Sequence, residues 1–435
     1  MVGKRTMKRL AAVAMVVAGT TGVPVQAADN TQINTAIDNG LAYLSTSQQG
    51  NGSWAYGGYD DAATGASAFA MMSQSVQWGA NTAAYQTKVD SAMAYLLSTA
   101  TKNTVSNRAD GYNMCPGGSG SCAGVYWYGS GESTYTTGLV AQAIGLYAQG
   151  KTNVVATTTG ALAGMTWGQI AQGVVNEWAV SQSVSGNYTG GWRYVLGQGS
   201  DADMSTTQWG AISMIYMKTL GATVPGQVNT DLEKFLNWTR NPVNGAGCYQ
   251  SPSTWCDHAD TGGLLLSLAY LGYGASDPRV SAAIGFLNTN WKDAANGTWY
   301  GNYDHPYAMW AEYKGLETTI GLSNTSGVTN LLDSDCSGVG SSVGGSPNAT
   351  NGNAPTSGTC NWWQDYNQWL VTHQNAGGGW GGYSYWTDPL ATAFYLPILG
   401  GTQIPTITET PEPESLALVA LALAGLAVTR RSRKA

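Results

Sequence analysis

One pattern recurs along most of the chain and restricts its fold more than any other feature. It consists of an apolar helix, a Gly-rich turn with an aromatic residue, and a second helix that opens on a polar residue. In the first copy the turn covers residues 50–54, and Asp60 and Asp61 open the second helix. The first helix of this copy has apolar residues at helical spacing, namely Ile33, Ile37, Leu41 and Leu44.

Further copies follow in the same order. Their first helices are predicted over residues 85–97, 170–180, 232–238, 280–291 and 362–371. Their second helices are predicted to open near Ser133, Asp203, Asp260, Asp304 and Asp388. Because no unit can bury its apolar face alone, neighbouring units must stack, and about six helix pairs close naturally into a ring. The pattern therefore predicts an all-α fold, a closed α/α toroid over residues 28–402 with one helix of each pair inside; an open helical solenoid is the alternative.

The first 27 residues have the parts of a secretory signal peptide. Basic residues (Lys4, Arg5, Lys8 and Arg9) precede an apolar run over residues 10–17, and small residues surround Ala27. The apolar run is too short to span a bilayer comfortably. We expect cleavage after Ala27, with a buried N-terminal helix as the alternative.

The C-terminus carries a second targeting segment. Pro411, Glu412 and Pro413 lie in a linker over residues 403–415, and an apolar stretch over residues 416–428 precedes a basic tail. This order resembles the PEP-CTERM sorting signal. The resemblance implies recognition by an exosortase-type enzyme that removes the tail, and a link to exopolysaccharide. Residues 416–435 are predicted to form a short transmembrane sorting helix with its basic end in the cytoplasm, so that the protein is anchored in the inner membrane before processing. A plain membrane anchor is the alternative.

Charge excludes one class of partner. Residues 28–408 hold 11 Lys and Arg against 23 Asp and Glu, so the net charge of the body is −12. Nucleic-acid binding needs Lys and Arg for the phosphates, and an acidic body argues against it.

The six cysteines form three local pairs. Each pair flanks a short polar loop: Cys115 with Cys122, Cys248 with Cys256, and Cys336 with Cys360. Pairing within each loop is the simplest of the many pairings that six cysteines allow, and an oxidising compartment permits it. A zinc site is the alternative, but no Cys-x-x-Cys is present and no metal site is predicted.

Two segments point to a known fold group. Residues 43–54 and 369–380 both have the order aromatic-Leu-x3-Gln-x3-Gly-x-Trp, and they resemble the QW repeat of squalene-hopene cyclases. Residues 304–309 also look like an inner-helix start of that group. The resemblance covers about residues 31 to 400 and implies the α/α toroid of the terpenoid cyclases and protein prenyltransferases.

The resemblance also implies a catalytic acid. The cyclases use an Asp-x-Asp-Asp motif to protonate an alkene, and the nearest stretch here contains Asp201 and Asp203. Asp203 matches the central acid, whereas Met204 replaces the carboxylate beside it. Asp203, Asp201 and Asp61 are therefore the catalytic candidates. A zinc site of the prenyltransferase type is not expected, because the cysteines are assigned to disulfides.

Aspartates recur where the second helices open. One interpretation is helix capping, which Asp favours. The other is a ring of carboxylates at the mouth of a central cavity, where crowding raises their pKa values and suits general acid catalysis or calcium binding.

Aromatic residues are the second feature of a candidate site. The chain has 17 Trp and 24 Tyr against 4 Phe, a bias typical of surfaces with one wet edge. Turn packing is predicted for Trp54, Trp192, Trp299 and Trp380. The candidate ligand-binding residues are Tyr126, Trp127, Tyr128, Asp260, Asp304, His305, Tyr383, Tyr385, Trp386 and Asp388.

Together these features predict an exported protein of the cell surface or extracellular matrix with an acidic, aromatic-lined cavity. The expected ligand is a glycan, with exopolysaccharide as the partner. One alternative is a carbohydrate-active enzyme, a hydrolase or lyase with paired carboxylates. Another is a degenerate terpenoid cyclase or prenyltransferase-like enzyme that uses Asp203. The sequence names no cofactor and does not decide whether the protein is catalytic.

Overall fold

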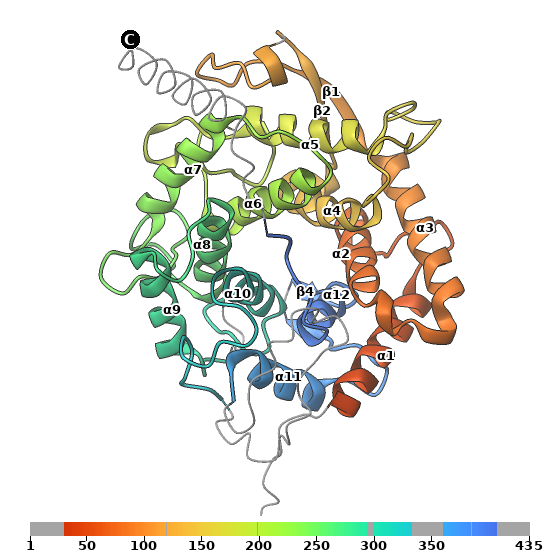
Figure 1. Ribbon diagram of the computed structural model, residues 1–435, viewed down its shortest axis with the longest axis vertical. Coiled ribbons are helices and arrows are strands. Elements are labelled where there is room, and N and C mark those ends of the chain that lie inside the picture. The colour runs from red at the N-terminus through yellow and green to blue at the C-terminus, as the bar shows by residue number, and fades with distance from the viewer. Residues whose placement is uncertain are drawn as a thin grey trace, which may run out of the picture.

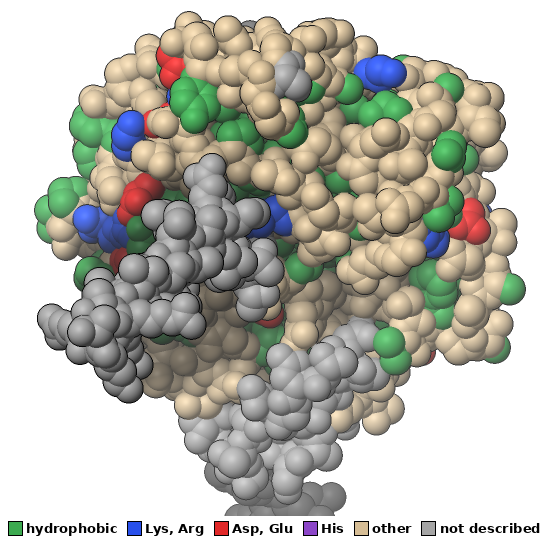
Figure 2. Space-filling view, turned by 45° about the horizontal axis from the view of Figure 1, so that its top comes forward, with side chains coloured by type: hydrophobic (Ala, Val, Ile, Leu, Met, Phe, Trp, Pro, Cys, Tyr) green, Lys and Arg blue, Asp and Glu red, His purple; other side chains and the backbone are tan. Residues whose placement is uncertain are grey.

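The computed structural model describes residues 30–118, 120–197, 199–294, 299–332, 360–383 and 385–406. The predicted signal peptide, the residues Pro411, Glu412 and Pro413, the sorting helix and Cys336 lie outside these ranges. Within them, no helix has the length and apolar character that a membrane span requires. The visible face of the molecule in Figure 2 carries few charged side chains, and several of them are neighbouring groups of opposite charge.

Twelve α-helices make up most of the described chain, and they alternate between two positions. The odd-numbered helices are α1 (Asn30–Ser47), α3 (Thr82–Thr99), α5 (Trp167–Ser181), α7 (Gly226–Thr239), α9 (Pro278–Asn290) and α11 (Trp362–His373). The even-numbered helices are α2 (Asp60–Ser73), α4 (Ser133–Tyr147), α6 (Met204–Thr219), α8 (His258–Tyr270), α10 (Pro306–Thr319) and α12 (Leu390–Leu399). Figure 1 shows the even-numbered helices around the centre and the odd-numbered helices outside them. We call them inner and outer helices.

The inner helices pack on one another in chain order. Each contacts the next from α2 to α12, and α12 also contacts α2. They are buried on nearly all sides and rich in small residues, as their crowding requires. The tightest approach is between α8 and α10, where a Cβ on Gly262 would lie 2.4 Å from the backbone of Ala311 and Glu312. Only glycine permits this distance.

Glutamine side chains join the turns to neighbouring outer helices. Gln48, Gln182 and Gln374 each donate from Nε2 to two carbonyl groups at 2.8–3.0 Å. One carbonyl belongs to a glycine of the same turn (Gly52, Gly190 and Gly378), and the other to the next outer helix (Lys88 in α3, Val228 in α7 and Ala36 in α1). The bonds from Gln48 and Gln182 join α1 to α3 and α5 to α7, which follow one another along the outer layer. The bond from Gln374 joins the last outer helix, α11, to the first, α1, in the same way.

Tryptophans of the turns pack against the preceding outer helix. The indole N–H groups of Trp54, Trp127, Trp192 and Trp380 donate to carbonyls of Leu44, Leu96, Trp178 and Leu370 at 2.7–2.9 Å. Trp127 was a candidate ligand-binding residue, but its side chain is fully buried in this packing and cannot reach a ligand. Trp299, expected to be a turn residue, is 44% exposed.

Two small antiparallel sheets interrupt the helical architecture, which the all-α prediction did not include. Strand β1 (Thr101–Val105) pairs with β2 (Cys122–Tyr126), and this hairpin packs on α5. Strand β3 (Gly382–Tyr383) pairs with β4 (Trp386–Thr387) just before α12.

Local disulfide pairing is confirmed for two of the three predicted loops. Cys115 is bonded to Cys122, and Cys248 to Cys256. The third pair includes Cys336, which lies outside the described residues.

Glu317 on α10 makes stability depend on pH. Burial raises the pKa of this carboxyl from 4.5 to about 7, against a hydrogen bond from the backbone of Ile404. The folded state thus favours the protonated carboxyl, which adds to the free energy of unfolding. This stabilisation is complete below the pKa of Glu317 in the unfolded chain, and it is lost as the pH rises through the pKa of Glu317 in the folded protein. Between about pH 5 and about pH 8, the wild type should lose about 1–2 kcal/mol more unfolding free energy than Glu317→Gln, since part of the ideal effect is screened. Urea unfolding at both pH values measures this difference; parallel losses would contradict it.

Candidate functional site

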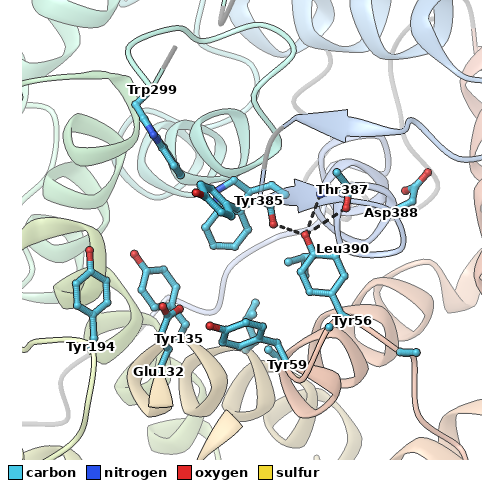
Figure 3. Close-up of a pocket in the computed structure, with 15 residues that line it drawn as sticks. Tyr56, Tyr59, Glu132, Tyr135, Tyr194, Trp299, Tyr385, Thr387, Asp388 and Leu390 are labelled. Carbon is cyan, nitrogen blue, oxygen red and sulfur yellow. Dashed lines mark hydrogen bonds between the residues drawn. The ribbon is translucent and has the colours of Figure 1, made fainter. Parts of the chain in front are cut away.

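A cavity with two adjoining lobes lies where the inner helices begin. The first lobe has a volume of about 740 Å³ and the second about 480 Å³. The lobes share four lining residues, Tyr135, Tyr194, Trp299 and Trp386. The first lobe adds Tyr56, Tyr59, Glu132, Tyr385 and Asp388 among others, and Figure 3 shows side chains from several elements converging on it. The second adds Ser205, Tyr249, Trp255, Asp257, Asp260, Tyr300 and Tyr307.

Stacked aromatic rings form the walls of the cavity. Trp386 lies on Tyr307 with ring centroids 4.6 Å apart and planes inclined by 11°. Tyr135 contacts Trp386 at 5.9 Å, and both of these rings line both lobes, whereas Tyr307 lines the second. At the mouth, Trp299 and Tyr385 stack at 5.9 Å while staying 44% and 71% exposed. Exposed flat rings at a cavity mouth suit contact with a ligand better than structural packing.

The hairpin that carries Tyr385 and Trp386 is held from the other end of the chain. The hydroxyl of Tyr56, just before α2, donates to the carbonyl of Tyr385 and accepts from the backbone N–H of Thr387 at 3.0 Å (Figure 3). Gly382 makes the tight hairpin possible, because it has a φ of 72° and a Cβ there would lie 2.0 Å from the carbonyl of Trp386. Contact between the first and last helix pairs therefore positions the aromatic rim.

Asp260 places a buried carboxyl with a raised pKa at the second lobe. It lies in the first turn of α8, is 3% exposed, and its Oδ1 has no hydrogen-bond partner among the described residues. Burial, with the nearby charges of Asp257 and Asp203, raises its pKa well above the usual range. Asp257 caps the helix by accepting from the N–H of Asp260 at 2.9 Å, and burial raises its pKa to about 7. A buried carboxyl that is protonated at neutral pH can donate a proton or a hydrogen bond.

Asp203 is committed to structure on both oxygens. Its Oδ1 accepts from the N–H of Thr206 at 2.9 Å, which caps α6, and its Oδ2 lies 2.5 Å from Arg193. Burial raises its pKa against these favourable contacts. Asp201 also pairs with Arg193, at 3.3 Å. Neither aspartate lines the described lobes. Both oxygens of Asp203 have partners, so the catalytic role of the two aspartates stays a prediction.

Asp61 points away from the cavity. Burial raises its pKa, and its hydrogen bonds go to Tyr95 and Thr99 on the outer helix α3. Asp61 does not line either lobe, and its catalytic role stays a prediction.

Of the predicted ligand-binding residues, Asp260, Tyr385, Trp386 and Asp388 line the cavity. His305 instead caps α10, accepting from Ala308 at 3.3 Å, and burial lowers its pKa to about 3. Tyr383 packs on His305 at 5.0 Å behind the rim. Tyr126, Tyr128 and Asp304 do not line either lobe, and Asp304 is exposed with a φ of 65°.

Sequence reasoning missed most of the tyrosines of the cavity. They lie in the loops before the inner helices or in their first turn, and this shared position is the signal that could have identified them. The missed lining residues include Tyr56, Tyr59, Glu132, Tyr135, Tyr194, Tyr249, Trp255, Tyr300 and Tyr307. In the described part of the chain, no group of three or more His, Cys, Asp or Glu side chains is placed to hold a metal ion.

Several solved structures are similar to this chain over most of its length, at low sequence identity. The apo type II terpene cyclase MstE from Scytonema has 13% sequence identity and a TM-score of 0.43, with 85% of this chain and 97% of that chain covered. A single-residue variant of MstE in complex with its substrate, geranylgeranyl dihydroxybenzoate, has 13% identity and a TM-score of 0.44, with 87% and 99% covered. A protein from Actinoplanes has 13% identity and a TM-score of 0.45, with 85% and 98% covered.

The C-terminus gives the most specific likeness. No curated protein matches the chain. Residues 409–434 match the family model of the PEP-CTERM protein-sorting motif. The chain therefore carries a PEP-CTERM protein-sorting motif at its C-terminus, which implies an exported, sorted protein, and its described body is mostly helical.

Proposed function

We propose that this protein is sorted by an exosortase-type enzyme to the cell surface or extracellular matrix, where the cavity of a closed α/α toroid binds a glycan. The observation that carries the proposal is the aromatic cavity with Trp299 and Tyr385 stacked and exposed at its mouth.

Export and sorting rest on the motif at residues 409–434. The proposed parts of the chain are a signal peptide over residues 1–27, a toroid over 28–402, a linker over 403–415, and a membrane-anchoring helix with a basic tail over 416–435. The two local disulfides agree with an oxidising compartment.

Closure of the ring is supported by contacts between the first and last helix pairs. Helix α12 contacts α2 as well as α10. Gln374 reaches Ala36 with the same bond that Gln48 and Gln182 make to their neighbours. An open solenoid would leave these groups apart.

Glycan binding is supported by the kind of aromatic residue in the cavity. The described lining residues include tryptophans and many tyrosines but no phenylalanine. A sugar ring has an apolar face that stacks on an aromatic ring and hydroxyl edges that need hydrogen-bond partners. Tyrosine supplies both surfaces in one side chain.

Removal of the aromatic rim tests this proposal. The full chain, purified in mild detergent, is titrated with labelled extracellular polysaccharide from the producing cells. Replacement of both Tyr385 and Trp386 by alanine should weaken binding at least about tenfold, which corresponds to about 1.4 kcal/mol. Tyr112→Ala is the control, because Tyr112 is 48% exposed but does not line the cavity. Equal affinities of the double variant and the wild type would contradict the site.

Glycan cleavage is a second candidate function, favoured by the neutral carboxyl of Asp260 beside Asp257. A general acid with a raised pKa and a nearby carboxylate are the groups that glycoside hydrolysis uses. Reducing-end release from bound polysaccharide should then fall at least about a hundredfold in Asp260→Asn. Absence of release by the wild type would rule out this candidate.

A further inference from the structure

The charge of the cavity is one-sided. Every titratable side chain that lines the described parts of the two lobes is a tyrosine or a carboxyl, the latter being Glu132, Asp257, Asp260 and Asp388. No Lys, Arg or His is among these lining residues. A ligand in the cavity therefore meets acids and aromatic faces without a compensating cation.

Two cations next to residues of the second lobe already have partners. Arg193 is paired with Asp203 and Asp201, and its guanidinium lies over the ring of Tyr194 at 4.6 Å. His258 is buried behind the lobe with Nδ1 2.5 Å from Glu312. Neither group is free to neutralise an acidic ligand or the carboxyl of Asp260.

Asp260 is an independent sign of a ligand. It is almost fully buried, it lines the second lobe, and its Oδ1 lacks a partner among the described residues. Oδ1 itself is closed to solvent, so a donor on a ligand would reach the carboxyl on the side that lines the lobe. An ammonium group would do so with a charge-assisted bond, the stronger kind.

We propose that the ligand is a sugar polymer with protonated amino groups, a de-N-acetylated hexosamine chain, and that Asp260 receives one of these ammonium groups. The inference rests on the proposed glycan binding and adds the class of glycan.

The aromatic rings favour the same ligand. Trp255, Trp299 and Trp386 line the second lobe, and an ammonium group over the face of an indole is attracted by the ring. A neutral N-acetyl sugar would gain the stacking contacts without this attraction. A uronate would bring a second negative charge against Asp257, which like-charge repulsion disfavours.

Binding of a cation should also release protons. An ammonium group favours the ionised form of Asp260 and Asp257, so it lowers their pKa values and displaces the proton that they hold. The charges of Asp257 and Asp203 raise the pKa of Asp260, and Tyr307 on α10 feels the charge of Asp260 in turn. Behind them lie Arg193, paired with Asp203, His258, paired with Glu312 and near Asp293, and Lys314 on α10, which donates to Gln208. The acids among them outnumber the cations, which supports this direction.

Calorimetry on the full chain in mild detergent tests the inference with three probes, hexamers of glucosamine, N-acetylglucosamine and galacturonate. The glucosamine hexamer should bind at least about tenfold more tightly than the N-acetylglucosamine hexamer. The galacturonate hexamer should bind most weakly. In buffers of different ionisation enthalpy at about pH 5, where the sugar amines already carry their protons, only the glucosamine hexamer should show proton release.

Two carboxyl variants complete the test. Asp260→Asn should remove the preference for glucosamine and leave binding of N-acetylglucosamine nearly unchanged. Glu317→Gln is the matched control, because Glu317 has a raised pKa but does not line the cavity, and it should keep the preference. If Asp260→Asn does not fold, proton release by the wild type still decides the matter.

Equal affinity for the three hexamers, glucosamine binding without proton release, or no binding of any hexamer would overturn the inference. None of these results would by itself overturn glycan binding, which the polysaccharide titration and the rim variants decide separately.

Discussion

Gly190→Ala is expected to destabilise the protein by about 4 kcal/mol, the largest effect of any single substitution proposed here. Gly190 lies in the turn between α5 and α6 with a φ of 105°, and a Cβ there would lie 1.8 Å from the carbonyl oxygen of Asp231 on α7. An alanine would be strained by its backbone conformation and would push the turn away from α7. That displacement would also break the bonds from Gln182 to Gly190 and to Val228. Urea unfolding followed by tryptophan fluorescence measures the loss.

Gly221→Ala separates the two causes. Gly221 has a similar φ of 85°, but no atom lies within 4 Å of its added Cβ. Its substitution should cost only the backbone term, about 1–2 kcal/mol. Similar losses in the two variants would show that the contact with α7 does not restrict position 190.

Periodicity and turn chemistry carried most of the helix prediction. Apolar spacing located all the outer helices, and in α1, α3, α7 and α9 it reflects one buried and one exposed face. The apolar run of α8 begins only at Leu264, but the polar opening at Asp260 placed the start close to His258, where the helix begins. Gly262 and Gly263 lie between these two positions, where α10 and Gln208 pack against the helix and leave no room for a side chain. These contacts are distant in sequence, so the residues around the two glycines do not indicate a helix.

Candidate site residues were harder to predict, because neighbouring positions near a helix start face opposite ways. Asp260 and Asp304 occupy the same position of the repeated pattern, at the predicted start of an inner helix. Asp260 falls within the first turn of α8 and lines the cavity, whereas Asp304 lies before the capping residue His305 and is exposed. The position of the aspartate relative to the capping residue, which differs by a few residues between the two helices, thus decides which acid lines the cavity.

Pairing also concealed the role of Asp203. The motif that it resembles suggested a free acid, but Arg193 lies ten residues earlier on the other side of the turn and neutralises it. The sequence contains both residues without showing that they meet. Asp260 has no such partner among the described residues, and only the folded arrangement distinguishes the two aspartates.

Gln182→Ala and Gln374→Ala are the second large pair of predictions, because they test whether the ring is closed. Gln182 is fully buried, donates to two carbonyls and accepts from Arg108 at 2.7 Å, so its loss should cost about 3 kcal/mol. Gln374 makes the same two donor bonds but is more exposed, and its loss should cost about 2 kcal/mol. The exposed Gln86, which bonds only within α3, is the control and should change stability by less than about 0.5 kcal/mol.

Hydrogen exchange then separates a closed ring from an open one. In a closed ring, Gln374 joins α11 to α1, so its removal should speed amide exchange in α1 and α12 more than in α6 or α8, because the weakened junction opens locally. The same opening would release the hairpin that Tyr56 holds through Tyr385, and binding of polysaccharide should weaken together with the protection of α12. In an open solenoid, helices α1 and α12 would be free ends, and Gln374→Ala would change neither stability nor exchange there while Gln182→Ala kept its full effect. A loss of stability in both variants, with exchange accelerated at different helices in each, would establish that the first and last helix pairs complete the wall of the cavity.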